Sequence, residues 1–235
     1  MKFDLYGDGI GTVDYVNHMG DDLTVVNSAR VSFGVEKEEL DAKDKRLINY
    51  LIRHRHTSTM EHNLITFRFC VPLFVRSQHH RHRTWSYNEI SRRYTDINIK
   101  FYEPRSFRTQ HKSNRQASNI EEKIDPVMIP DLSDSSMGTK ASHCIEQHHK
   151  TSLKLYNDLM KKGVCREQAR GVLPQNMYTE YYGTVNLSNL LKFIDLRTHE
   201  GAQWEIQKVA EACLAVANEL FPETVGAYRR IGNKE

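Results

Sequence analysis

Apolar residues recur along this chain with the periods of both helices and strands. The first fifteen residues alternate loosely between apolar and polar, which predicts a strand or hairpin. Asp21 or Asp22 can then cap a helix that runs to about Ser32, and Asp44 can start a second helix. At helical spacing, that second helix carries on one side Leu47, Ile48, Leu51 and Ile52.

The rest of the chain mixes strands with more helices. Leu64 to Val71 is rich in β-branched and aromatic residues and predicts a strand, and Pro72 suits the first turn of a short helix after it. Ile97 to Tyr102 predicts another strand. The segments predicted beyond these are helices at about Lys140–Lys162 and Arg166–Val172, a strand at Met177–Val185, and helices at Leu187–Leu196 and Ala202–Phe221.

Composition places these elements in one domain of an ordinary soluble protein. The length of 235 residues predicts a single domain over residues 1–235, and a composition of 39% hydrophobic and 27% charged residues is ordinary for a soluble protein. The predicted elements together make this domain α+β, mostly helical with a small sheet. No apolar run approaches the roughly 20 residues that cross a bilayer, and the N-terminus resembles no signal peptide. We therefore expect a cytoplasmic protein without a membrane partner.

One long polar stretch interrupts the pattern at about residues 105–139. It holds two of the six prolines, and we expect a surface excursion that could move over a site. The four cysteines are scattered without CxxC spacing, which indicates reduced, inert thiols.

Basic residues gather at one place in the chain. The overall balance is 33 basic against 30 acidic residues, too even for a protein that coats nucleic acid. Within Arg81–Tyr94 (RHRTWSYNEISRRY), however, four arginines accompany one glutamate, with serines, an asparagine and aromatic residues between them. A guanidinium is a flat, permanently charged fork that fits phosphate or carboxylate oxygens. The cluster therefore predicts a site for a phosphorylated or otherwise anionic small molecule.

Three other polar groups have both a structural and a functional interpretation. The turn before the first buried strand contains His56, Ser58, Glu61 and His62, which are polar packing residues or ligand contacts. Arg170 precedes Pro174. Arg197 lies near a helix C-terminus, where a cation also interacts favourably with the last carbonyls.

Several other chemistries lack their motif. His79, His80 and His82 are crowded among arginines, and Cys144 with His148 lacks a second ligand pair, so we predict no metal site. The chain has no GxSxG, GxxxxGK[ST] or GxGxxG sequence. Nothing identifies a base for Ser91, so its hydroxyl is better suited to donate to a phosphate than to act as a nucleophile.

The order of these segments resembles the flavin-dependent thymidylate synthase family. The family signature RHRxxSxNExSxRY is matched without a gap, from Arg81 to Tyr94. Further likenesses, in the family's order, are NSARVSF at 27–33, HxxxxEH at 56–62, VLP at 172–174, TVN at 184–186, and LR at 196–197 followed by AQWEI at 202–206. The polar stretch after Arg105 shows least likeness.

The resemblance implies reductive methylation of dUMP to dTMP. Methylenetetrahydrofolate would supply the carbon, FAD would carry the hydride, and NADPH would reduce the flavin. The implied assembly is a homotetramer whose active sites are shared between subunits. The absence of any cysteine in the cluster agrees with a route that needs no protein thiol.

The family pattern also implies roles for individual residues. Arg197 matches the arginine that polarises the uracil ring and would be the catalytic group. Positions matched to dUMP binding are Gln78, Arg81, Glu89, Ser91, Arg93, Arg170 and Arg197, with Arg92 joining them through its backbone. Positions matched to FAD are His56, Ser58, Arg81, His82, Arg83, Glu89 and Asn186.

Three positions depart from the family, and two rival interpretations stay open. Ser188 stands where a relative can have arginine, Lys192 where an asparagine often contacts the flavin, and Gly201 where a histidine commonly precedes AQ. These changes put the adenine end of the FAD site in question. A relative that kept the fold and lost activity is therefore one rival. The other is a nucleic-acid-binding module that stacks bases on Trp85 or Tyr87; Glu89 and the near-neutral charge disfavour it.

Overall fold

The computed structural model describes residues 1–128 and 138–232, which form two compact units. The first unit comprises residues 1–70, 78–88 and 181–235, and the second comprises residues 71–77 and 89–180. The chain therefore passes between them within single elements, including strands β3 (Leu64–Pro72) and β9 (Tyr178–Asn186). The prediction of one domain over residues 1–235 stays a prediction.

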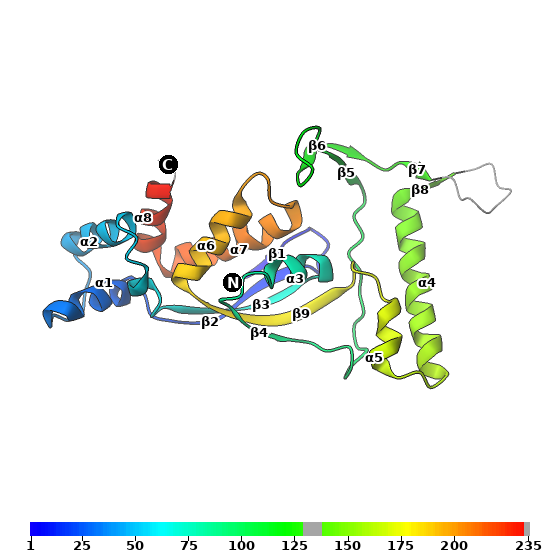
Figure 1. The fold of residues 1–235 in the computed structure, drawn as a ribbon, viewed down its shortest axis with the longest axis horizontal. Helices are drawn as coiled ribbons and strands as arrows, with labels where there is room; N and C mark the ends of the chain where they lie inside the picture. Colours follow the sequence, from blue (N-terminus) through cyan, green and yellow to red (C-terminus); the bar gives the residue numbers. More distant parts are fainter. Residues whose placement is uncertain (129–137, 233–235) are drawn as a thin grey trace. The chain divides into compact units, whose positions relative to one another are not determined.

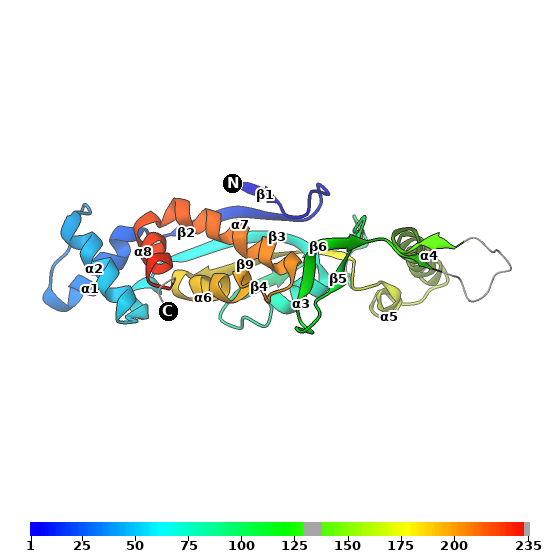
Figure 2. The ribbon, with the colours of Figure 1, turned by 90° about the horizontal axis from the view of Figure 1, so that it is seen from above.

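The first unit is built around antiparallel strands covered by helices (Figures 1 and 2). The sheet order is β1-β2-β3-β9-β4. Its N-terminal strands are β1 (Lys2–Asp4) and β2 (Thr12–Met19), as the alternation of the first residues predicts. Helices α6 (Leu187–Thr198) and α7 (Trp204–Leu220) lie side by side, and α7 packs on β2.

Two aspartates fix the start of the first helix and the last. Asp21 caps α1 (Asp22–Arg30) and forms a capping box with Thr24. The buried carboxylate of Asp22 instead accepts hydrogen bonds from the backbone N–H groups of Glu223 and Thr224, both at 2.9 Å. It thereby caps α8 (Pro222–Gly232), a helix that the sequence analysis did not predict.

The second predicted helix has a different cap from the one expected. Helix α2 (Ala42–Arg53) begins at Asp41, whose side chain accepts from the N–H groups of Lys43 and Asp44. Asp44 is fully buried at the third helical position, where Arg30 and Lys37 neutralise it. The prediction of Asp44 as the starting residue is therefore wrong by three positions. A 3₁₀ turn, η1 (Val31–Phe33), precedes α2, and another, η2 (Thr57–Met60), follows it.

The second unit holds the long helix α4 (Ala141–Lys161), which contacts α5 (Arg166–Ala169) and η3 (Arg170–Val172). Helix α3 (Leu73–His79) begins directly after Pro72 and ends in the first unit. Part of the expected polar excursion is regular. Its strands are β5 (Phe107–Gln110), β6 (Ser118–Ile124), β7 (Val127–Met128) and β8 (Thr139–Lys140), and residues 129–137 lie outside the described part.

The predicted strand at Ile97–Tyr102 is wrong. Only Phe101 forms an isolated bridge, to Met177. Asn98 adopts a left-handed conformation with φ of 54°, which interrupts extended backbone. The strand of this region is instead β4 (Ser86–Glu89), inside the arginine-rich cluster.

The remaining segments agree with the predicted α+β class, mostly helical with a small sheet. The buried apolar residues of α7 include Ile206, Val209 and Cys213. None of the helices within residues 1–128 and 138–232 is long and apolar enough to cross a membrane.

Candidate functional site

The arginine-rich segment Arg81–Tyr94 is anchored by its aromatic side chains. Trp85 is 6% exposed and packs against Phe69 at 6.0 Å and His79 at 4.5 Å between ring centroids. The Tyr87 hydroxyl donates to the carbonyls of His79 and His82. Trp85 therefore belongs to the core and does not offer a face on which a nucleic-acid base could stack, which weighs against the rival interpretation.

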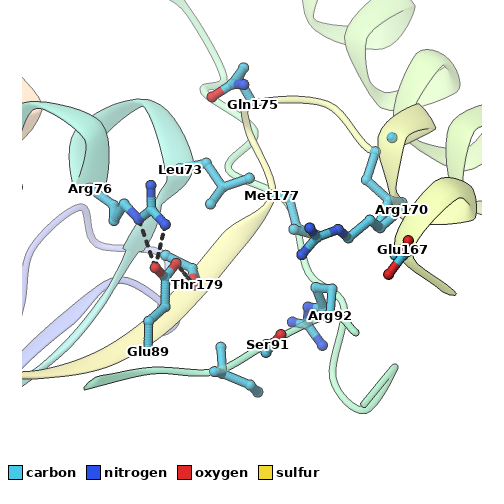
Figure 3. A pocket seen from close by; sticks show the side chains of 13 residues that line it. Leu73, Arg76, Glu89, Ser91, Arg92, Glu167, Arg170, Gln175, Met177 and Thr179 are labelled. Atoms are coloured by element: carbon cyan, nitrogen blue, oxygen red, sulfur yellow. Dashed lines mark hydrogen bonds and ion pairs between the residues drawn. The ribbon is translucent and has the colours of Figure 1, made fainter. Parts of the chain in front are cut away.

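A pocket of about 550 Å³ lies in the second unit, and the signature segment supplies one of its walls (Figure 3). Glu89, Ser91 and Arg92 line it from β4 and the residues that follow. The backbone N–H of Ile90 donates to the carbonyl of Glu180 at 2.9 Å, which fixes this wall to β9. Arg170 lines the pocket from η3, so residues about 80 positions apart in sequence share one cavity.

Glu89 is held by two partners in this pocket. Arg76 donates to its carboxylate from both Nε, at 2.8 Å, and Nη2, and Thr179 donates from its hydroxyl at 2.7 Å (Figure 3). Sequence reasoning missed Arg76. Its only signal is a cation inside the otherwise apolar start of α3.

Arg92 is the buried cation of the pocket. It is 7% exposed, and its Nη1 donates to the carbonyl of Ile97 at 2.7 Å. Burial lowers the pKa of its guanidinium. The neighbouring Arg93 is exposed and faces Glu167 at 3.6 Å. Ser91 accepts a hydrogen bond from the Arg93 backbone at 3.3 Å, so the hydroxyl proton of Ser91 is free to be donated to a ligand.

The predicted catalytic arginine lies in the first unit, beside His82. Arg197 on α6 donates from Nε to Nε2 of His82 at 3.1 Å. Burial, and then the charge of Arg197, lower the pKa of His82 to about 4. The imidazole is consequently neutral near pH 7 and holds the guanidinium in place as an acceptor.

The other residues of the first unit that were predicted to bind dUMP or FAD lie in different surroundings. Gln78 is hydrogen-bonded to Gln203. The side chains of His56, Ser58, Arg81 and Arg83 are exposed. Asn186 caps α6, with its side-chain oxygen accepting from the N–H of Asn189 at 2.9 Å.

A second cavity, of about 280 Å³, lies in the first unit between η2, α6 and α8. Three cationic side chains line it: Arg53, Arg55 and Lys192. Ser188 also lines it, and the buried Ser188 hydroxyl has no hydrogen-bond partner within the described residues. Tyr228 closes another part of the wall by donating to Asp195 at 2.6 Å.

Comparison with known proteins decides the family. The model of the family described as thymidylate synthase complementing protein matches residues 14–223. This chain belongs to that family. Flavin-dependent thymidylate synthases are among the relatives: one from Thermus thermophilus is 40% identical over 93% of this chain and 75% of its own length, and one from Thermotoga neapolitana is 39% identical over 95% and 93%.

Solved structures of the same fold are also similar. The UMP/dUMP methylase PolB from Streptomyces cacaoi, bound with 5-Br dUMP, has a TM-score of 0.78 and 32% identity over 94% of this chain and 95% of its own. A second structure of that protein holds 5-Br UMP, with a TM-score of 0.77. The resemblance drawn from the signature is thereby confirmed at the level of family and fold.

Proposed function

We propose that this enzyme converts dUMP to dTMP by reductive methylation, with methylenetetrahydrofolate as the carbon donor, FAD as the redox cofactor and NADPH as the reductant. The observation that carries the proposal is the pocket lined by Ser91, Arg92 and Arg170 in a chain of this family. Two guanidinium groups and a free hydroxyl donor form a phosphate-binding arrangement. The nucleotides bound by the Streptomyces cacaoi methylase support a uridylate as its ligand.

The first unit offers groups that fit a flavin dinucleotide. Such a molecule carries a pyrophosphate, which needs cations and hydrogen-bond donors. The cavity of Arg53, Arg55 and Lys192 supplies the cations, and the unpartnered hydroxyl of Ser188 supplies a buried donor. The departures at Ser188 and Lys192 therefore leave a cationic cavity in place. Retained activity is favoured over the rival of an inactive relative.

Two of the predicted FAD residues, His56 and Ser58, border this cavity in sequence. Arg55 and Thr57 line it and alternate with His56 and Ser58 along the chain. We propose that His56, Ser58, Arg81, His82, Arg83, Glu89 and Asn186 contact FAD. When bound, the flavin supplies the hydride that reduces the transferred carbon.

The protein side chains bind and polarise the nucleotide. Ser91, Arg92 and Arg170 hold the phosphate, and Gln78, Arg81 and Arg93 are the further dUMP contacts that we propose. Arg197 places a fixed positive charge at the pyrimidine ring and stabilises the negative charge that develops there. Its Nε is committed to His82, so its Nη groups are the donors that remain.

No cysteine is needed for this chemistry. None of the residues that line the two cavities is a cysteine, and Cys213 is fully buried, which raises the pKa of its thiol. A route without a protein thiol nucleophile is consistent with both facts. We further propose a homotetramer in which several subunits contribute to each site.

Absorption spectroscopy and product analysis test the proposal. We expect purified protein to be yellow, to oxidise NADPH faster with dUMP present, and to form dTMP only when methylenetetrahydrofolate is added. Release of label from C5 of dUMP should accompany turnover, and UMP in a parallel reaction shows whether the ribonucleotide is also accepted. A protein that cannot be reconstituted with FAD, or that forms no methylated nucleotide, would refute the proposal.

A further inference from the structure

Arg92 is a buried cation whose environment lacks part of its compensation. It is 7% exposed, and Nη1 is its one group with a protein acceptor, the carbonyl of Ile97. Its Nε is buried without a hydrogen-bond partner in the described part of the chain. A charged group with an unpaired donor is costly to bury, because it loses its water without gaining an acceptor. An anion in the pocket that Arg92 lines would compensate its charge.

The charged side chains around the pocket suit a ligand that carries two negative charges. Its lining contains three arginines and two glutamates. Glu89 is bound by Arg76, and the exposed Glu167 faces Arg93 outside the lining. The side chain of Arg170 has no ion pair or hydrogen bond among the described residues, and in Figure 3 it extends from η3 across the pocket toward the side that carries Arg92. Arg92 and Arg170 are therefore the two arginines of the lining that form no ion pair within the described residues, although Asp96 offsets part of the charge of Arg92 from further away.

Position 92 is one that the family signature leaves open, so its side chain is a property of this chain. The resemblance gave Arg92 only a backbone contact. The structure adds a guanidinium that lines the cavity, with Nη1 held by the carbonyl of Ile97 and a buried Nε that has no partner among the described residues. A fork of this kind binds two oxygens of one phosphate, which a lone charge cannot do as specifically.

We propose that the Arg92 side chain determines specificity in this pocket, pairing with Arg170 to select a doubly charged phosphate monoester over singly charged esters and uncharged nucleosides. The inference rests on the proposed function for the identity of the nucleotide. It goes beyond that function because it assigns the charge selection to a side chain that the family does not specify. It also predicts weaker binding as the phosphate takes up its second proton, near pH 6.

Isothermal titration at pH 8 of the FAD-loaded protein tests this inference with three ligands: dUMP, the methyl ester of its phosphate, and deoxyuridine. Wild type should prefer dUMP to the ester by at least about tenfold. Arg92→Gln should weaken the binding of dUMP about tenfold to a hundredfold and the binding of the ester far less, because the second negative charge of the dUMP phosphate loses its cationic partner. The affinity of Arg92→Lys for dUMP should lie between those of wild type and Arg92→Gln, because lysine keeps the positive charge but lacks the two-pronged guanidinium.

Arg115→Gln is the matched control. Arg115 is an exposed arginine of the same unit outside the pocket lining, and its replacement changes the net charge by the same amount. It should leave all three affinities unchanged. An equal effect of Arg115→Gln and Arg92→Gln would mean that only overall charge matters, which would overturn the inference.

The inference and the proposed function fail in different ways. If Arg92→Gln binds dUMP and its ester with the wild-type ratio, the inference is overturned and the function stands. If wild type does not bind dUMP, the proposed function fails, and binding of inorganic phosphate decides the inference: weaker binding by Arg92→Gln supports it, and equal binding overturns it. Circular dichroism shows whether Arg92→Gln is folded. If it is misfolded, the wild-type protein and Arg92→Lys decide the inference through the ratio of their affinities for dUMP and for the methyl ester. A wild-type ratio near one overturns the inference, and a large wild-type ratio that is lower in Arg92→Lys supports it.

Discussion

The hydrogen bond from Arg197 to His82 makes a specific prediction about one proton. Nε2 of His82 accepts from Nε of Arg197 at 3.1 Å, so the single ring proton of the neutral imidazole belongs on Nδ1. Burial is the larger cause that lowers the pKa of His82 to about 4, and the charge of Arg197 is the smaller one. Replacing Arg197 with Gln removes only the smaller cause. We therefore expect the pKa of His82 to rise in Arg197→Gln and to stay below its ordinary value of about 6.5.

The same shift makes the free energy of unfolding depend on pH. Between about pH 4 and 6.5 the unfolded chain binds a proton at His82 that the folded chain does not, so stability rises with pH through this window and is complete above it. The full shift would correspond to roughly 3 kcal/mol. Solvent screens the half-exposed ring, so about 1–2 kcal/mol is the realistic contribution. His79, whose pKa burial holds well below its ordinary value, adds to the same trend.

Two measurements check these values. A pH titration of the histidine ring signals by NMR, assigned with His82→Gln, gives the pKa of His82 directly. Urea unfolding at pH 4.5, 5.5 and 7 should show a shallower pH dependence in His82→Gln than in wild type, with the contribution of His79 remaining. A wild-type His82 that titrates near 6.5, or one whose pKa is the same in Arg197→Gln, would show that the imidazole is not held neutral beside this guanidinium.

Three further substitutions have expected outcomes. Ser91→Ala should raise the Kd for dUMP about tenfold and leave turnover at saturating dUMP nearly intact; complete loss of turnover would instead make Ser91 a nucleophile. Arg76→Met should leave Glu89 without its ion pair and cost roughly 1–3 kcal/mol in urea unfolding, whereas an unchanged midpoint would mean that water replaces Arg76. Gly183→Ala would place a Cβ 2.9 Å from the Phe69 ring and should cost about 1–3 kcal/mol, unless that ring can shift.

Helix starts show how far local sequence determines structure here. Asp21 was one of two candidate caps for α1, and it is the cap. Asp41 and Asp44 are equally plausible near the start of α2, because both can accept backbone N–H groups. The structure distinguishes them through Arg30 and Lys37, which bind the buried Asp44. Those partners come from outside the helix, so local periodicity could not have identified them.

The strands predicted at Leu64–Val71 and Met177–Val185 are confirmed as β3 and β9, but one predicted strand is wrong and one strand was missed. Ile97–Tyr102 is rich in β-branched and aromatic residues, yet the left-handed Asn98 prevents a strand. Ser86–Glu89 is polar and nevertheless forms β4, at the end of the sheet order beside β9. Neighbouring strands thus decided a conformation that the residues of this segment did not favour by themselves.

In the candidate site, too, the sequence motif identifies residues, whereas the tertiary structure determines which partners they have. The signature drew attention to Glu89, Ser91 and Arg92, and the structure shows that these residues line one pocket. It could not show that Arg76 neutralises Glu89 while Arg92 keeps an unpaired donor, because both facts depend on residues outside the motif. An arginine becomes a candidate ligand contact when the fold leaves its charge uncompensated, and that property belongs to the three-dimensional neighbourhood. The number of uncompensated guanidinium groups in a pocket therefore predicts the charge of its ligand, which is why Arg92, rather than the more exposed Arg93, is expected to set the preference for a dianion.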